Sequence, residues 1–272
     1  MAKKEIISPT ESEIISREFI VSKIQQIAEE REKSGTSAVL IPQIRNLQAE
    51  AISQKEHNLV IQLYQEEFLS AQHMVMEERS KGLKNSDKLR LANGLYIMEK
   101  SITSMGKYQE EHQANISPIV KARNFRFLGR FADYTHQYRK SEGLYRQGLE
   151  YFDSQVEPEN KFHRLELLGF ISFSLLKQGK KDEGIKLMNQ VLDDYDQSPE
   201  GQWLKQQDYY TWAVWKSGVE IRNSEYLIKH SDSTTAINLM IDAENILKMP
   251  DGTTEKFSLR IGELNRLKTL SP

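Results

Sequence analysis

Apolar residues recur at helical spacing along almost the whole chain. From Glu13 to Ile27 they lie on one face of a helix, and Thr10 with Glu13 forms a capping box before it. Pro42, a residue type favoured in first helical turns, marks the start of the next helix. The same spacing predicts further helices at 59–76, 87–102, 119–135, 139–153, 160–177, 182–195, 201–222, 233–248 and 254–269. No run alternates between apolar and polar residues, so the pattern predicts an all-α fold.

One segment of the chain carries a repeat signature. An aromatic residue stands three positions before Leu128-Gly129, and Ala132 stands three positions after the glycine. We expect Gly129 to permit close approach of two antiparallel helices, and Ser141 and Gly148 are small where the second helix crosses the first. Larger side chains of residues 119–196 are predicted to be buried between the helices: Phe125, Leu128, Tyr145, Leu168 and Leu175.

This spacing resembles the tetratricopeptide repeat (TPR), and a second copy follows it. The turn from Gly179 to Gly184 resembles the turn between the two helices of that family's repeat. Ser141 and Gly184 occupy corresponding positions but are 43 residues apart, against a family period of about 34. The chain therefore resembles a divergent TPR-like protein, with irregular repeats and an insertion around 156–161.

The resemblance implies antiparallel helix pairs stacked in a right-handed, TPR-like superhelical solenoid. We expect one all-helical repeat domain over residues 1–272. Within it, 1–37 is an N-terminal helix and 38–117 holds degenerate helical repeats. The best TPR-like repeats are at 118–196, and 197–272 supplies C-terminal helices and a cap.

Charge and composition narrow the class of protein. The formal net charge is −2, so no overall basic field favours nucleic-acid binding. There is no cysteine, which excludes disulfides and thiolate zinc sites. No apolar run reaches the roughly 20 residues of a membrane span, and no signal-peptide core follows the N-terminus. We therefore expect a soluble, cytoplasmic protein.

Catalytic and metal-binding motifs are missing from the sequence, so we expect no enzyme activity, cofactor or metal. Asp133 and His136 have the acid-x-x-His spacing of helical di-metal sites, but one motif cannot build such a site, and an ordinary solvated pair is the simpler interpretation. The glutamate doublets at 66–67, 77–78 and 110–111 are interpreted as solvated helix faces. Three tryptophans offer either a ligand cage or a core stripe: Trp203, Trp212 and Trp215.

An arginine face is the candidate binding site. Arg123, Arg126 and Arg130 share one face of the helix that carries the Leu-Gly signature, beside Tyr134. In the TPR-like register this face lines the concave groove, where guanidinium groups suit the carboxylates of a partner. The alternative is that these arginines form ion pairs with neighbouring helices, for example with Glu166.

The resemblance implies a non-catalytic scaffold or adaptor for protein–protein interaction. Its partner would be a peptide, helix or protein, with an acidic segment or C-terminal carboxylate held in the groove. Two alternatives stay open: a regulatory peptide receptor or chaperone-like adaptor within a larger complex, and a helical enzyme with an unrecognised site. The oligomeric state and the identity of the partner do not follow from the sequence.

Overall fold

The computed structural model describes residues 16–32, 35, 37–82, 85–230 and 232–270, and within these ranges it contains helices and no strand. The all-α prediction is confirmed. The α-helices are α1 (Arg17–Arg31), α2 (Ser37–Ser53), α3 (His57–Ser80), α4 (Lys88–Glu111), α5 (Pro118–Tyr134), α6 (Tyr138–Asp153), α7 (Pro158–Lys161), α8 (His163–Lys177), α9 (Lys181–Gln197), α10 (Pro199–Gln207), α11 (Tyr209–Lys229), α12 (Ser233–Ile246) and α13 (Ser258–Lys268). Two short 3-10 helices are η1 (Gln113–Asn115) and η2 (Glu255–Phe257).

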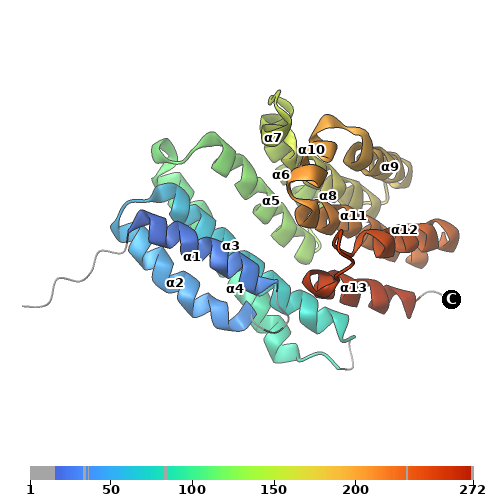
Figure 1. Ribbon diagram of the computed structural model, residues 1–272, viewed down its shortest axis with the longest axis horizontal. Helices are drawn as coiled ribbons and strands as arrows, with labels where there is room; N and C mark the ends of the chain where they lie inside the picture. Colours follow the sequence, from blue (N-terminus) through green and yellow to red (C-terminus); the bar gives the residue numbers. More distant parts are fainter. Residues whose placement is uncertain (1–15, 33–34, 36, 83–84, 231, 271–272) are drawn as a thin grey trace, which may run out of the picture.

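Helices that follow one another in the chain pack side by side. The most extensive contacts join α2 to α3, α3 to α4, α5 to α6, α8 to α9 and α11 to α12. In Figure 1, α1 to α4 form one side of the molecule, α6 to α12 form the other, and α5 lies between them. Helix α13 packs against both α11 and α3. The last helix therefore joins the C-terminal half of the fold to the N-terminal half.

Two hydrophobic cores meet at α5. Val120 and Phe127 belong to the core built with α1 to α4, whereas Ala122 belongs to the core that extends to α13. The Phe127 ring packs edge-on against Phe68 of α3, with ring centroids 5.5 Å apart. Since one helix contributes to both cores, α5 fixes the position of one half relative to the other.

Small residues lie where α5, α6 and α8 come closest. A Cβ added to Gly129 would clash with the ring of Tyr145, two of whose carbon atoms would be 2.7 Å away. A Cβ on Gly148 would be 3.0 Å from a backbone carbonyl oxygen of α5. Ser141 is fully buried, and its Oγ lies 3.0 Å from Oγ of Ser174. The predicted close approach at Gly129, Ser141 and Gly148 is confirmed.

The predicted buried set is right in part. Tyr145, Leu168 and Leu175 are buried. Phe125 and Leu128 are only half-buried, and Phe127 is buried instead. The difference arises because α5 packs against α3 and α4 as well as α6. Its buried stripe is therefore turned toward Phe127, away from the face that a lone α5–α6 pair would bury.

Some predicted helix boundaries are wrong. Helix α2 begins at Ser37, five residues before Pro42, so the proline lies inside the helix. The predicted helix at 201–222 is two helices that meet at Asp208, whose carboxylate caps α11 by accepting a hydrogen bond from the backbone N–H of Thr211 at 3.0 Å. The predicted capping box at Thr10 and Glu13 lies outside the described residues.

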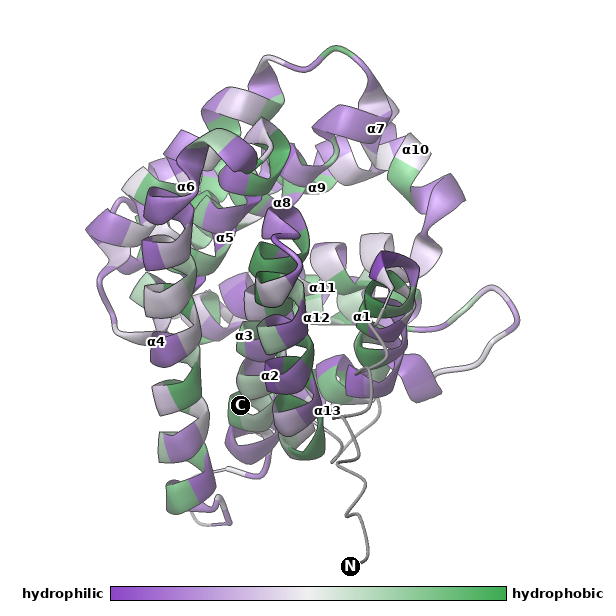
Figure 2. Cartoon of the chain, turned by 90° about the vertical axis from the view of Figure 1, so that its left-hand side faces the viewer, coloured by the Kyte–Doolittle hydropathy of each residue, from purple (hydrophilic) through white to green (hydrophobic). Residues whose placement is uncertain are grey.

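No helix within the described ranges is long and apolar enough to cross a membrane. In Figure 2 the helices nearest the viewer carry both hydrophilic and hydrophobic residues along their length. The expectation that no segment spans a membrane agrees with this finding.

Candidate functional site

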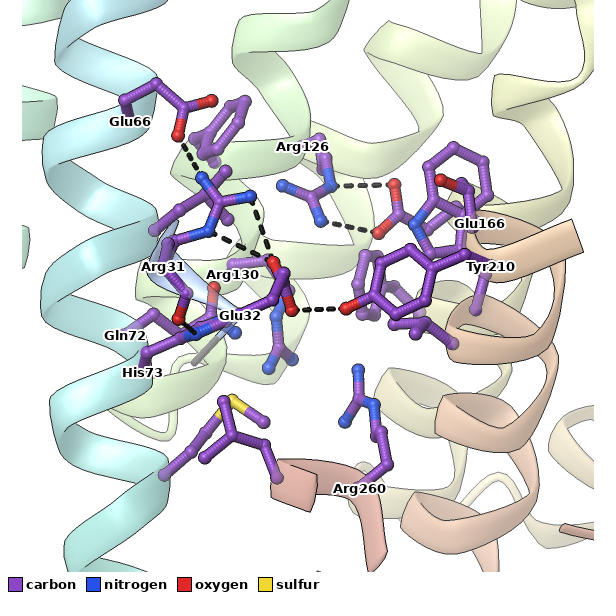
Figure 3. Close-up of a pocket in the computed structure, with 18 of the residues that line it drawn as sticks. Arg31, Glu32, Glu66, Gln72, His73, Arg126, Arg130, Glu166, Tyr210 and Arg260 are labelled. Carbon is purple, nitrogen blue, oxygen red and sulfur yellow. Dashed lines mark hydrogen bonds and ion pairs between the residues drawn. The ribbon is translucent and has the colours of Figure 1, made fainter. Parts of the chain in front are cut away.

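A cavity of about 270 Å³ lies where α1, α3, α5, α8, α11 and the η2–α13 segment meet (Figure 3). Helices α2, α4, α6, α9, α10 and α12 contribute no residue to its lining. Six arginines and one lysine line it, against three glutamates: Arg31, Arg123, Arg126, Arg130, Arg222, Arg260, Lys256, Glu32, Glu66 and Glu166. A chain with a slightly negative net charge therefore concentrates positive charge in one partly open cavity.

The arginine face predicted from sequence forms one wall of this cavity. Arg123, Arg126 and Arg130 all line it from α5. Tyr134 lies at the end of α5 and does not line it; its ring lies beneath the guanidinium groups of Arg130 and Arg79, 5.1 and 4.8 Å from the ring centroid. Tyr134 therefore supports Arg130 from outside the cavity and does not share in its lining.

The ion-pair alternative also holds for part of this wall. Arg126 makes a bidentate pair with Glu166 of α8, at 2.7 Å from Nε and 2.6 Å from Nη2. Arg130 contacts Asp133 at 3.3 Å. Arg123 makes no hydrogen bond or ion pair within the described residues, and burial together with neighbouring Arg126 lowers its pKa. Of the three predicted arginines, Arg123 is thus the one that engages none of its donors within the described residues.

A second group of cations lies on α11 and α13. Arg222 makes no hydrogen bond or ion pair in the described part of the chain, and its Nε is buried without a partner. Burial, followed by the charges of Arg130 and Arg260, lowers the pKa of Arg222 to about 9, so it stays cationic at neutral pH. Arg260 pairs with Glu263 at 2.6 Å through Nη1. This group was not found from the sequence.

The C-terminal end of α1 closes one side of the cavity through polar contacts. Arg31 pairs with Glu66 of α3 and with Glu32, and Tyr210 of α11 donates a hydrogen bond to Glu32 (Figure 3). His73 lies 3.1 Å from the backbone oxygen of Arg31, which can only accept, so Nδ1 carries the proton. Burial is the main cause that lowers the pKa of His73 to about 4, so the ring is neutral at pH 7.

The expectation for Asp133 and His136 is wrong in one respect. Asp133 is buried, and its carboxylate accepts hydrogen bonds from Tyr145 at 2.7 Å and from Ser174 at 3.3 Å. It therefore joins α5, α6 and α8. His136 is exposed at the turn after α5, with φ of 60°. In the described ranges no group of three or more histidine, aspartate or glutamate side chains could hold a metal ion.

The glutamate doublets of α3 are not solvated faces. Glu67, Glu77 and Glu78 are buried, and Glu66 lines the cavity. Helix α3 packs against α1, α2, α4, α5 and α13, so it has no broad solvent face. The buried carboxylates instead pair with cations of neighbouring segments, as Glu67 does with Arg45 at 2.6 Å. The doublet at 110–111 is exposed, as predicted.

The three tryptophans divide between the two interpretations. Trp212 is buried in the core, where its Nε1 donates to the backbone oxygen of Tyr195 at 3.0 Å. Trp215 lines the cavity and stacks on Phe162, with ring centroids 5.8 Å apart. Trp203 also contacts Phe162, with ring centroids 5.2 Å apart. No tryptophan cage forms, since only Trp215 reaches the cavity.

Comparisons with protein-family models, with curated proteins and with solved structures yield no match to this chain.

Proposed function

We propose that the chain is a non-catalytic TPR-like adaptor that holds an acidic peptide segment or C-terminal carboxylate of a partner protein in the arginine-lined cavity. The observation that carries the proposal is the presence of two cavity arginines, Arg123 and Arg222, that no carboxylate in the described residues engages. A buried, unpaired guanidinium group is costly, and a carboxylate satisfies it through two parallel hydrogen bonds.

The TPR-like arrangement, a right-handed solenoid of helix pairs, is part of the same proposal. Its support is the close approach at Gly129 and Gly148, where the TPR pattern places small residues. A second support is that the cavity is lined by the first helix of each pair, α5, α8 and α11, as expected for a concave groove.

One observation favours the regulatory-receptor form of this function. The glutamates of the cavity already engage Arg31 and Arg126, so an acidic ligand would compete with Glu32, Glu66 and Glu166 for the same donors. Competition at Arg31 would release the end of α1 from α3. Ligand binding would then change the position of α1, as a receptor requires and a passive scaffold does not.

The test uses dye-labelled hexapeptides and fluorescence anisotropy. We expect an acidic peptide with a free C-terminus to bind more tightly than its amidated and neutral counterparts, and to bind less as salt rises. Arg123→Glu should weaken this binding at least tenfold. We choose Arg123 because a glutamate at position 126 would also place a second carboxylate next to Glu166.

The matched control is Arg139→Glu, which reverses the same charge on the exposed surface of α6. It should leave peptide affinity unchanged within twofold. Equal losses in both variants would show that only the overall charge matters, and equal affinity of the acidic and neutral peptides would contradict the proposed function.

A further inference from the structure

Three arginines from three helices line the cavity, and the charges of two of them act on the third, Arg222: Arg130 of α5, Arg222 of α11 and Arg260 of α13. We refer to them as the arginine triad. Arg130 and Arg222 both lie over the ring of Phe170, each with its guanidinium carbon 4.6 Å from the ring centroid. Figure 3 shows Arg260 projecting from α13 into the space between α3 and α11.

Gly218 leaves open the space into which two of these groups point. A Cβ at this position would be 2.9 Å from Nη1 of Arg222 and 3.1 Å from Nη2 of Arg260. Both guanidinium groups therefore reach the same small region beside α11. A side chain at 218 would crowd both groups.

The triad leaves hydrogen-bond donors unused. In each of the three arginines Nε is buried and has no hydrogen-bond partner in the described part of the chain. Arg130 contacts Asp133 at 3.3 Å and Arg260 contacts Glu263 at 2.6 Å, each through Nη1, while Arg222 has no ion pair with any acidic residue that the structure describes. Buried unsatisfied donors are uncommon in folded proteins, so three in one cluster indicate a missing acceptor.

We propose that the arginine triad is a subsite for a phosphate group, which the bound ligand carries. A phosphate monoester has three terminal oxygens and a charge of about −1.5 to −2 at pH 7, so it can accept from three guanidinium forks at once. A carboxylate has two oxygens and one charge, which one fork already satisfies. This inference rests on the proposed function only in that the same cavity admits the ligand.

The test is isothermal titration calorimetry of the full chain with inorganic phosphate, and with acetate at the same ionic strength. We expect saturable phosphate binding and at least tenfold weaker acetate binding. Arg222→Gln should reduce phosphate affinity at least tenfold. Gly218→Ala should also weaken phosphate binding, by a smaller factor and without any change of charge, because its Cβ would lie 2.9 and 3.1 Å from nitrogens of the two guanidinium groups and shift them slightly.

The matched control is Gly106→Ala, a substitution at a helical glycine of α4 where a Cβ would meet nothing within 4 Å. It should bind phosphate like the original chain. Loss of binding in this control as well, or acetate affinity equal to that of phosphate, would overturn the phosphate assignment. Absence of phosphate binding by the unaltered chain would overturn it too.

Two further titrations identify the source of the phosphate group. A phosphoserine hexapeptide that binds more tightly than inorganic phosphate would support a phosphorylated segment of a partner, and the reverse order would support a free phosphate ion or small phosphate ester. If phosphate binds but no acidic peptide does, the proposed adaptor function fails and the subsite stands. If acidic peptides bind and phosphate does not, the subsite fails and the adaptor function stands.

Discussion

The phenol of Tyr210 donates a hydrogen bond to the carboxylate of Glu32, which joins α11 to the end of α1 across 178 positions of sequence. Glu32 also pairs with Arg31, which reaches Glu66 on α3. The end of α1 is thus held to α11 and α3 by polar contacts at the edge of the cavity.

Removal of the phenol oxygen should loosen α1. Tyr210→Phe keeps the ring and deletes one hydrogen bond to a charged group, so we expect a loss of about 1–2 kcal/mol of unfolding free energy. Hydrogen exchange measured by mass spectrometry should become faster in 17–32 and stay unchanged in α6. Unchanged exchange at 17–32 would show that α1 is held by its apolar contacts alone.

Loss of the Arg222 charge should stabilise the fold. In phosphate-free buffer, Arg222→Met removes a buried, unpaired cation. We expect the free energy of unfolding to rise by about 1–2 kcal/mol, because the substitution leaves no buried carboxylate without its cation. Arg126→Met is the matched comparison, since it leaves Glu166 buried without its pair. It should cost about 3 kcal/mol. Urea unfolding of both variants measures the difference, and a destabilised Arg222→Met would mean that this arginine holds the fold together.

An overpacking substitution at Gly129 should destabilise the junction of α5 and α6. Gly129→Leu would push a side chain into the ring of Tyr145, at a cost of about 1–3 kcal/mol or more. Gly106→Leu, in open space on α4, should leave the melting temperature near that of the original chain or raise it. Equal melting temperatures for the two leucine variants would contradict the close contact at Gly129.

Acid should weaken the fold through His73. Its pKa is lowered to about 4, chiefly by burial, against about 6.5 in the unfolded chain. Between these values the unfolded chain binds a proton that the folded chain does not. Proton binding by the unfolded chain lowers the free energy of unfolding. The contribution of His73 to that free energy is therefore fully present above pH 6.5 and decreases by up to about 3 kcal/mol as the pH falls toward 4.

The measurement is urea unfolding at several pH values between 7 and 4. His73→Gln keeps a donor for the Arg31 carbonyl and cannot titrate, so its stability should fall less steeply over this window. The slope should not become flat, since burial also lowers the pKa of His163 well below its ordinary value. Identical slopes for the variant and the original chain would show that His73 is not the titrating group.

Sequence periodicity identified one wall of the cavity and could not identify the others. Arg123, Arg126 and Arg130 repeat within one helix, so their common face follows from helical geometry alone. Arg31, Arg222 and Arg260 are single residues on separate helices, and their meeting depends on how α1, α11 and α13 pack. One signal was present: Arg222 follows Ile221 in an otherwise buried stretch of α11.

Local helix signals were reliable where no neighbour intervened. The starts of α5 and α12 were predicted within one residue, whereas α2 extends before Pro42 and α11 begins at the cap of Asp208. The burial of Glu78 could not be predicted from the sequence. Its charge is compensated by Lys81, three residues further along the chain, and by Arg90 of α4. The contact with Arg90 is a tertiary contact, and the helical periodicity of the sequence does not indicate such contacts.

The packing of α13 against α3 has a consequence for synthesis of the chain. Helices α1, α3, α5, α8 and α11 leave the ribosome before α13, so a growing chain lacks Arg260 and one side of the cavity until α13 has emerged. The final contact also joins segments far apart in sequence, which makes its formation slow compared with the pairing of adjacent helices. A chain whose synthesis has not yet reached α13 can therefore pair its earlier helices while this side of the cavity is still missing.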